Sequence, residues 1–383
     1  MFSALPLALL SLLSATGFES ASPHQLSRRS VGQATLLLLS FSQHASLASA
    51  SSLHRRANKL QTDTNGSSFI WTIQDTYEGK TFFDTFDFFT GEDPTHGMVN
   101  YTDRATALAN NLVYVTEDDK VIMKGDNTTS LASGVYRNSV RISSQAQYNT
   151  GEPSIRINIA CDVLDMPTGE IDIIEGVHDN AHNQVTWHTG PNCYLDTNVS
   201  FTGTPVSSGT NITCDGNANG NAGCGVTEWS RASYGPIFDQ QGGGVFAMKW
   251  DDQGIAVWSF YRAAVPADVL AGSPTPSTWG EPVALLDPSS CDPITNFVNH
   301  SIVFGDWAGN SYATSGCPGT CTDRLMDPSN FVNASWNINT LKVYRKQTLT
   351  GLVNGAESEV CARVLCKVTW LALALPILVL VVL

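Results

Sequence analysis

The segment Gly169–Gly176 constrains the fold more than any other part of the sequence. Its three carboxylates, Glu170, Asp172 and Glu175, fall within six residues and are separated by isoleucines. On a β-strand Glu170 and Asp172 share a face because side chains alternate, whereas Glu175 would point to the opposite face. One extra residue in a β-bulge returns Glu175 to the shared face, but positions i, i+2 and i+5 of a helix do not share one. The segment therefore predicts a bulged strand with three carboxylates on one side.

Crowded carboxylates raise the pKa of at least one of their number, which then keeps its proton near neutrality. A charged and a protonated carboxyl group about 5 Å apart carry out the chemistry of a retaining glycosidase. We predict that Glu170 is the nucleophile and that Glu175 is the general acid and then the base. Asp172 would hydrogen-bond between them. The alternatives are a calcium site or a solvated acidic edge strand, and the β-branched isoleucines argue against a solvated face.

Several other segments accompany the carboxylates in a fixed order. They are Thr81–Asp84, Asp93–Gly97, Val99–Tyr101, Asn183–Thr189, Gly242–Met248, Gly305–Gly309 and Leu341–Tyr344. With these segments, the chain from about Thr76 to Lys346 resembles family 16 glycoside hydrolases of the fungal laminarinase-like branch. The resemblance implies an all-β fold, a β-jelly-roll sandwich with the active strand in its concave sheet. It also implies retaining hydrolysis of internal β-1,3 or mixed β-1,3/1,4 bonds, with a β-glucan as the partner.

The resemblance suggests further site residues. Trp307 matches a tryptophan that stacks on glucose, and Asp306 precedes it in the same segment. His188 matches a histidine that faces the carboxylates, while Asn100 lies in a stretch that contacts sugar. The alternatives are a core tryptophan and a structural histidine. We expect no metal and no cofactor: Cys317 and Cys321 form a close pair, but no second close Cys/His pair stands beside them, as a zinc site would require.

Two departures from the family pattern bear on activity. A Trp-, Gly- and Pro-rich segment that the family carries before the active strand is absent, because Met166–Thr168 leads directly into Gly169. The chain is also shorter ahead of Gly305. A neighbour of the active strand is then missing or is replaced by Ser154–Ile159. The missing segment makes a catalytically weak carbohydrate-binding β-sandwich one alternative to hydrolysis. The other is transglycosylation, in which a sugar captures the covalent intermediate instead of water, although the bulged spacing favours the laminarinase type.

Composition agrees with a chain of many strands and turns. Only 15% of the residues are charged, and the 31 glycines and 17 prolines suit frequent turns. A net charge of −14 argues against nucleic acid or an anionic membrane surface as a partner. No sustained helical period is present. Alternation predicts strands at Val140–Ser143, Ser154–Ile159, Gln184–His188, Val245–Trp250 and Ile255–Phe260.

The two ends of the chain have the composition of processing signals. Residues 1–56 contain short apolar runs that predict a signal peptide and a possible propeptide, and residues 57–348 form the predicted domain. Residues 349–383 combine small residues, a spacer and an apolar tail, the pattern of a GPI-attachment signal, with a tail-anchored helix as the alternative. We expect a secreted or cell-surface monomer that meets the membrane only through this lipid anchor.

Cysteine usage and glycosylation signals favour the same route. The sequence has 9 cysteines, of which Cys214 and Cys224 flank one loop and are expected to pair. Seven Asn-x-Ser/Thr sequons support passage through the secretory pathway. They are Asn65, Asn100, Asn127, Asn198, Asn211, Asn299 and Asn333.

Overall fold

The strands predicted from alternation are present in the structure, a computed structural model. It describes residues 59–94, 96–149, 154–157, 169–176, 180–231, 233–305 and 319–350, with the backbone alone for 154–157. One of the observed strands, β11 (Gln184–His188), has the predicted bounds, and the other four differ from theirs by one or two residues at an end. These four are β8 (Arg141–Ser144), β9 (Ser154–Ile157), β16 (Gly244–Asp251) and β17 (Gly254–Tyr261).

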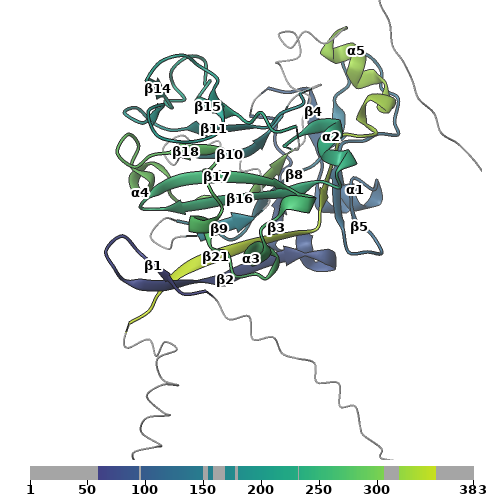
Figure 1. Ribbon diagram of the computed structural model, residues 1–383. Coiled ribbons are helices and arrows are strands. Elements are labelled where there is room, and N and C mark those ends of the chain that lie inside the picture. The colour runs from purple at the N-terminus through teal and green to yellow at the C-terminus, as the bar shows by residue number, and fades with distance from the viewer. Residues whose placement is uncertain are drawn as a thin grey trace, which may run out of the picture. The chain divides into compact units, whose positions relative to one another are not determined.

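The largest described sheet has seven antiparallel strands in the order β1-β2-β21-β9-β16-β17-β18. Its central strands come from distant parts of the sequence and lie side by side in Figure 1. The strands not yet given are β1 (Gln61–Thr62), β2 (Ser68–Glu78), β18 (Ala284–Leu286) and β21 (Thr340–Thr348).

The predicted carboxylate strand lies in a second antiparallel sheet. This strand, β10 (Glu170–Glu175), pairs with β11, which pairs with β15 (Cys224–Thr227) and then β13 (Thr204–Pro205). Among the described residues β10 and β13 are the two edge strands of this sheet. The suggestion that Ser154–Ile159 replaces a neighbour of the active strand is wrong. The β9 strand instead pairs with β16 and β21, because its backbone completes the centre of the other sheet.

Shorter strands and helices complete the described fold. The remaining sheets are β19-β8-β3, β20-β6-β5, β12-β14 and the parallel pair β4-β7. Their strands are β3 (Phe86–Phe88), β4 (Val99–Tyr101), β5 (Val113–Val115), β6 (Val121–Lys124), β7 (Arg137–Ser139), β12 (Tyr194–Asp196), β14 (Asn211–Thr213), β19 (Val303–Gly305) and β20 (Ser335–Ile338). The α-helices are α1 (Arg104–Ala109), α2 (Gly235–Gln240), α3 (Ala267–Leu270), α4 (Pro293–Asn296) and α5 (Cys321–Met326). The 3-10 helices are Gly79–Thr85, Arg262–Ala264, Pro276–Thr278 and Pro328–Phe331. None of the described helices is long and apolar enough to cross a membrane.

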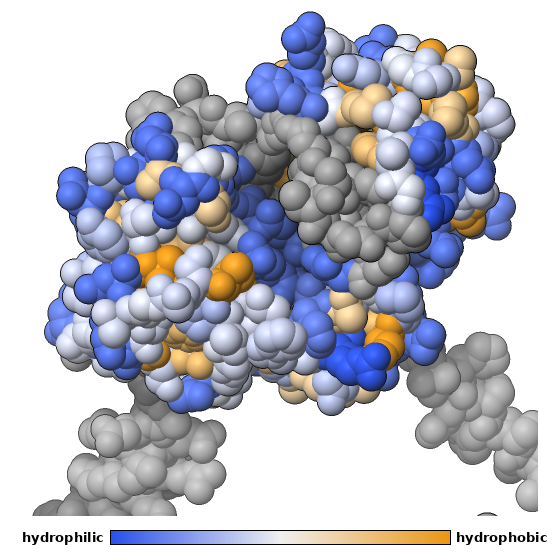
Figure 2. All heavy atoms as spheres, turned by 90° about the horizontal axis from the view of Figure 1, so that it is seen from above, coloured by the Kyte–Doolittle hydropathy of each residue, from blue (hydrophilic) through white to orange (hydrophobic). Residues whose placement is uncertain are grey.

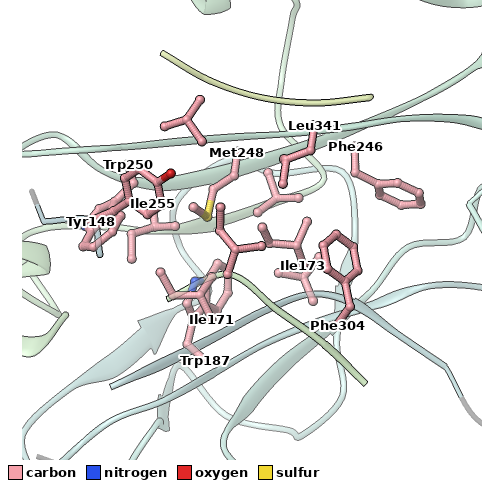
Figure 3. Packing of buried hydrophobic residues seen from close by; sticks show 14 of the residues in the cluster. Tyr148, Ile171, Ile173, Trp187, Phe246, Met248, Trp250, Ile255, Phe304 and Leu341 are labelled. Atoms are coloured by element: carbon pink, nitrogen blue, oxygen red, sulfur yellow. The ribbon is translucent and has the colours of Figure 1, made fainter. Parts of the chain in front are cut away.

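The two larger sheets enclose a common core, so the described chain is a β-sandwich. Ile171 and Ile173 of β10 are fully buried and belong to the same apolar cluster as Met248 and Trp250 of β16. Figure 3 shows these side chains converging from the two sheets. Burying each such side chain is worth about 1.5–3 kcal/mol, so the isoleucines of the carboxylate segment anchor it to the core.

The alternation along β16 shows why this strand is apolar from Val245 to Met248. Phe246 and Met248 point into the core between the sheets, whereas Val245 and Ala247 belong to a second apolar cluster with Trp71. Both faces of the strand are therefore covered, which is typical of a central strand with a nearly continuous apolar sequence.

Candidate active site

A bulge in β10 places the three predicted carboxylates on one face. Glu170 lies opposite His188 and Asp172 lies opposite Thr186, but Glu175 lies opposite Gln184. Three residues of β10 thus span what two residues of β11 span, which is the extra residue predicted from the sequence. Ile171 and Ile173 point into the core as the alternation requires. We call the side of this sheet that carries Glu170, Asp172 and Glu175 the carboxylate face.

The buried side chain of Asn183 braces the bulge. Its Nδ2 donates to the carbonyl of Ile173 at 2.8 Å, and its Oδ1 accepts from the amide of Glu175 at 3.0 Å. Asn183 is completely buried, and its own amide donates to Ser233 Oγ at 3.0 Å. A bulge leaves backbone groups unpaired in the ladder, so Asn183 supplies the partners that β11 cannot. From the sequence alone, Asn183 is only part of a segment that matches the family, and no role is predicted for it.

Two side chains of β11 hold one oxygen of Glu175. Thr186 Oγ1 donates to Glu175 Oε2 at 2.8 Å, and Gln184 Nε2 donates to the same oxygen at 3.2 Å. Gln184 Nε2 also donates to Thr186 Oγ1 at 2.9 Å. Because Oε2 accepts these hydrogen bonds, a proton on Glu175 belongs on Oε1, which has no donor in this set.

His188 faces Asp172 from the neighbouring strand, as predicted. Its Nε2 lies 3.4 Å from Asp172 Oδ2, and its Nδ1 donates to Asn221 Oδ1 at 3.0 Å. Burial disfavours the charged ring, but the hydrogen bond and the charge of Asp172 outweigh it, with help from Glu175 and Asn221, so the pKa of His188 is raised. A neutral ring with its proton on Nδ1 would turn a lone pair toward a carboxylate, which also favours the imidazolium form.

The loop that carries Asn221 is held tightly against His188. The predicted disulfide between Cys214 and Cys224 closes this loop. Gly223 has a φ of +60°, and a Cβ there would lie 2.7 Å from His188 Cε1, so only glycine allows this approach. A second disulfide, Cys193–Cys291, was not predicted.

Glycine also sets the entry to β10. Gly169 has a φ of +75°, and a Cβ at this position would lie 2.3 Å from the carbonyl oxygen of Asn296. The strand therefore begins with Glu170 close against α4, which determines where the first carboxylate emerges. Glu170 is buried, whereas Glu175 at the other end of the strand is exposed.

Glu170, Asp172 and His188 each offer one ligand atom, and these atoms lie within 4.8 Å of one another. Such a group has the spacing to hold a metal ion. The raised pKa of His188 opposes this use, because a metal ligand must be the neutral imidazole. In the described structure His188 forms an ion pair with Asp172.

The other predicted sugar-binding residues are Asn100, Asp306 and Trp307. Asn100 lies on β4, is exposed, and donates through Nδ2 to Asn138 Oδ1 at 2.6 Å. Asp306 and Trp307 lie outside the described residues. Their role in binding sugar stays a prediction. Hydrophilic residues line a hollow on the upper side of the molecule, the side on which β11 and β15 lie in Figure 1 (Figure 2).

The sequence matches the profile of a family described as XgeA-like, catalytic GH16 domain, over residues 86–168 and 162–344. The two parts of the match meet just before Gly169, where the sequence analysis found a family segment missing. A probable glycosidase of Schizosaccharomyces pombe is 41% identical over 289 residues, covering 70% of this chain and 68% of that protein. An endo-1,3(4)-β-glucanase of Arthroderma benhamiae is 35% identical over 314 residues, covering 73% and 66% respectively.

A solved structure, GH16 Laminarinase 16A of Phanerochaete chrysosporium with β-glucans in both donor and acceptor sites, is 38% identical. It aligns with a TM-score of 0.64 over 72% of this chain and 99% of that one. The expected β-jelly-roll sandwich is thereby confirmed. The chain spans about two thirds of the length of the two relatives named above. The profile, the relatives and the shared fold show that this chain belongs to glycoside hydrolase family 16.

Proposed function

We propose that this chain is a retaining endo-β-glucanase that hydrolyses β-1,3 or mixed β-1,3/1,4 bonds. The observation that carries the proposal is the bulge of β10, which places Glu170, Asp172 and Glu175 on one face. The names of the Arthroderma benhamiae relative and of the Phanerochaete chrysosporium structure support a β-glucan as the substrate.

The proposed reaction has two steps. The Glu170 carboxylate attacks the anomeric carbon while the bond to the leaving sugar breaks, and Glu175 gives its proton to the departing oxygen. Glu175 then takes a proton from water, and the water oxygen displaces Glu170 from the anomeric carbon. Thr186 and Gln184 hold Glu175 Oε2 throughout, which leaves Oε1 to carry the proton.

Asp172 and His188 act through their neighbours in this proposal. Asp172 lies between the two glutamates on the same face, and its Oδ2 lies 3.4 Å from Nε2 of His188, whose raised pKa favours the charged ring. Part of the negative charge on the strand is therefore balanced from β11.

Substitution of the glutamates tests the assignment. Glu170→Gln and Glu175→Gln should each remove most release of reducing sugar from laminarin, since general acid catalysis alone contributes roughly 10²–10⁴-fold. Azide should rescue Glu170→Ala and give a product of inverted configuration. Full activity in either Gln variant would overturn the roles. Products longer than the substrate would indicate transglycosylation, and sugar binding without turnover would indicate a binding sandwich.

Export of the protein is the second part of the proposal. Its support comes from the two disulfides, which are typical of oxidising compartments, and from the sequons, whose asparagines are exposed except for the half-buried Asn127. A mass decrease after treatment with an N-glycosidase would test it. The domain boundaries, the monomeric state and the lipid anchor stay predictions. The exposed asparagines are Asn65, Asn100, Asn198, Asn211, Asn299 and Asn333.

A further inference from the structure

Trp229 is the one tryptophan among the exposed large apolar residues of the described chain. Its side chain is 60% exposed. An indole ring buries a large apolar area when it packs into a core, so leaving it in water forgoes that stabilisation. Single exposed apolar residues are common on protein surfaces. Trp229 differs from such residues in its position on the sheet and in its contacts with neighbouring side chains.

Trp229 lies on the carboxylate face. Glu175 of β10 is opposite Gln184 of β11, which is opposite Thr227 of β15. The amide of Glu228 donates to the carbonyl of Asn183, which extends this pairing past the end of β15. Trp229 is two residues beyond Thr227 and therefore returns to its side of the sheet. Glu228, between them, is buried and accepts a hydrogen bond from Ser259 Oγ on the opposite side.

Two neighbouring side chains hold the indole ring in place. Its Nε1 donates to Thr204 Oγ1 at 2.9 Å, and Thr204 on β13 lies opposite Thr227. The ring of His182 meets the indole edge to face, with centroids 5.1 Å apart and planes at 64°. An aromatic ring fixed before binding loses little side-chain entropy when a ligand arrives.

The separation from the carboxylates suits a chain-like ligand. Trp229 is two strands away from β10, about 10 Å across the sheet, and further along the strand direction than Gln184. The side chains between them, Gln184 and Thr227, are polar and half-buried. A flat apolar ring stacks on the C–H face of a pyranose, while polar groups beside it can bind hydroxyl groups. The row of side chains that runs across the sheet from Glu175 to Trp229 therefore fits a polysaccharide chain lying across the strands.

We propose that Trp229 forms a distal glucan-binding subsite that stacks on one glucosyl ring of a substrate cleaved at the carboxylates. This inference rests on the proposed function and adds a specificity to it. The subsite favours long glucans over short oligosaccharides, because only a long chain reaches from Glu175 to Trp229.

Kinetics on β-1,3-gluco-oligosaccharides of increasing length, and on laminarin, test the subsite. Trp229→Ala should raise the KM for laminarin by about tenfold, a typical effect of losing one aromatic stacking contact. It should leave kcat, and the kcat/KM of the shortest hydrolysed oligosaccharide, unchanged. Trp229→Phe keeps a stacking face but loses the hydrogen bond to Thr204. Its KM for laminarin should lie between the values of the unaltered protein and of Trp229→Ala. Tyr261→Ala is the matched control, since this exposed tyrosine ends β17 in the other sheet.

Retardation of the protein in gels containing laminarin separates this inference from the proposed activity. Retardation of the unaltered protein that Trp229→Ala abolishes supports the subsite even where no hydrolysis occurs. Hydrolysis with the same dependence on chain length in both proteins overturns the subsite and leaves the activity standing. The subsite is also overturned if Trp229→Ala lowers kcat/KM equally for substrates of every length. Retardation in the gel that Trp229→Ala leaves unchanged overturns it as well. If the folded wild-type protein neither binds nor cleaves laminarin, both proposals are wrong.

Discussion

Replacement of Asn183 by alanine should disturb the bulge of β10 without touching a carboxylate. The substitution removes the donor to the Ile173 carbonyl and the acceptor of the Glu175 amide, both supplied by one completely buried side chain. A buried polar group left without a partner costs about 1–3 kcal/mol. Since the Glu175 amide lies nearer to solvent, we expect a total loss of about 2–4 kcal/mol in the free energy of unfolding. Urea denaturation measures it.

The same substitution should affect catalysis in a way that depends on the leaving group. With the bulge loosened, Glu175 no longer holds its proton at the departing oxygen, so laminarin hydrolysis should fall by roughly 10²-fold. An aryl β-glycoside with a good leaving group needs little protonation and should lose much less of its kcat. Asn183→Asp keeps an oxygen acceptor for the Glu175 amide and should retain more activity than Asn183→Ala. A positioning role for Asn183 would be refuted if Asn183→Ala lowered kcat equally for laminarin and for the aryl β-glycoside. An unchanged kcat in a folded Asn183→Ala variant would also refute it.

Three further predictions concern burial, cross-links and stereochemistry. Burial raises the pKa of Glu228 to about 7 despite the hydrogen bond from Ser259, so the folded protein holds this proton more tightly than the unfolded chain. The free energy of unfolding should therefore fall as pH rises from about 4.5 to about 7. Glu228→Gln should remove this dependence and stabilise the protein by up to ~3 kcal/mol above pH 7. Identical pH profiles of the unaltered protein and Glu228→Gln in calorimetry would contradict this prediction. Opening Cys193–Cys291, with a separation of 98 residues, should cost about 4–5 kcal/mol, against about 3 kcal/mol for Cys214–Cys224, with a separation of 10; equal losses for the paired Ser variants would argue against the loop-entropy explanation. Early products of laminarin cleavage, followed by NMR, should be β-anomers, whereas initial α-anomers would indicate inversion.

The carboxylate strand shows which structural features a local sequence pattern can predict. Alternation, the out-of-step Glu175 and the isoleucines predicted the strand, its bulge and its buried face, and the structure confirms all three. These features are encoded locally, because the period of a strand and the need to bury β-branched side chains act within a few residues. The placement of His188 opposite Glu170 also agrees with the prediction, which rested on the resemblance to the family.

Other features required the folded chain. Asn183 braces the bulge only because β11 returns beside β10, and β9 joins the centre of the other sheet although its sequence suited a neighbour of the active strand. Composition did not predict that Cys193 would meet Cys291 or that Trp229 would lie on the carboxylate face. The sequence by itself determined the chemistry of the strand and which side of it is apolar. The tertiary structure decided which distant residues surround that chemistry, since those contacts depend on the order in which strands pair and not on the period within any one of them.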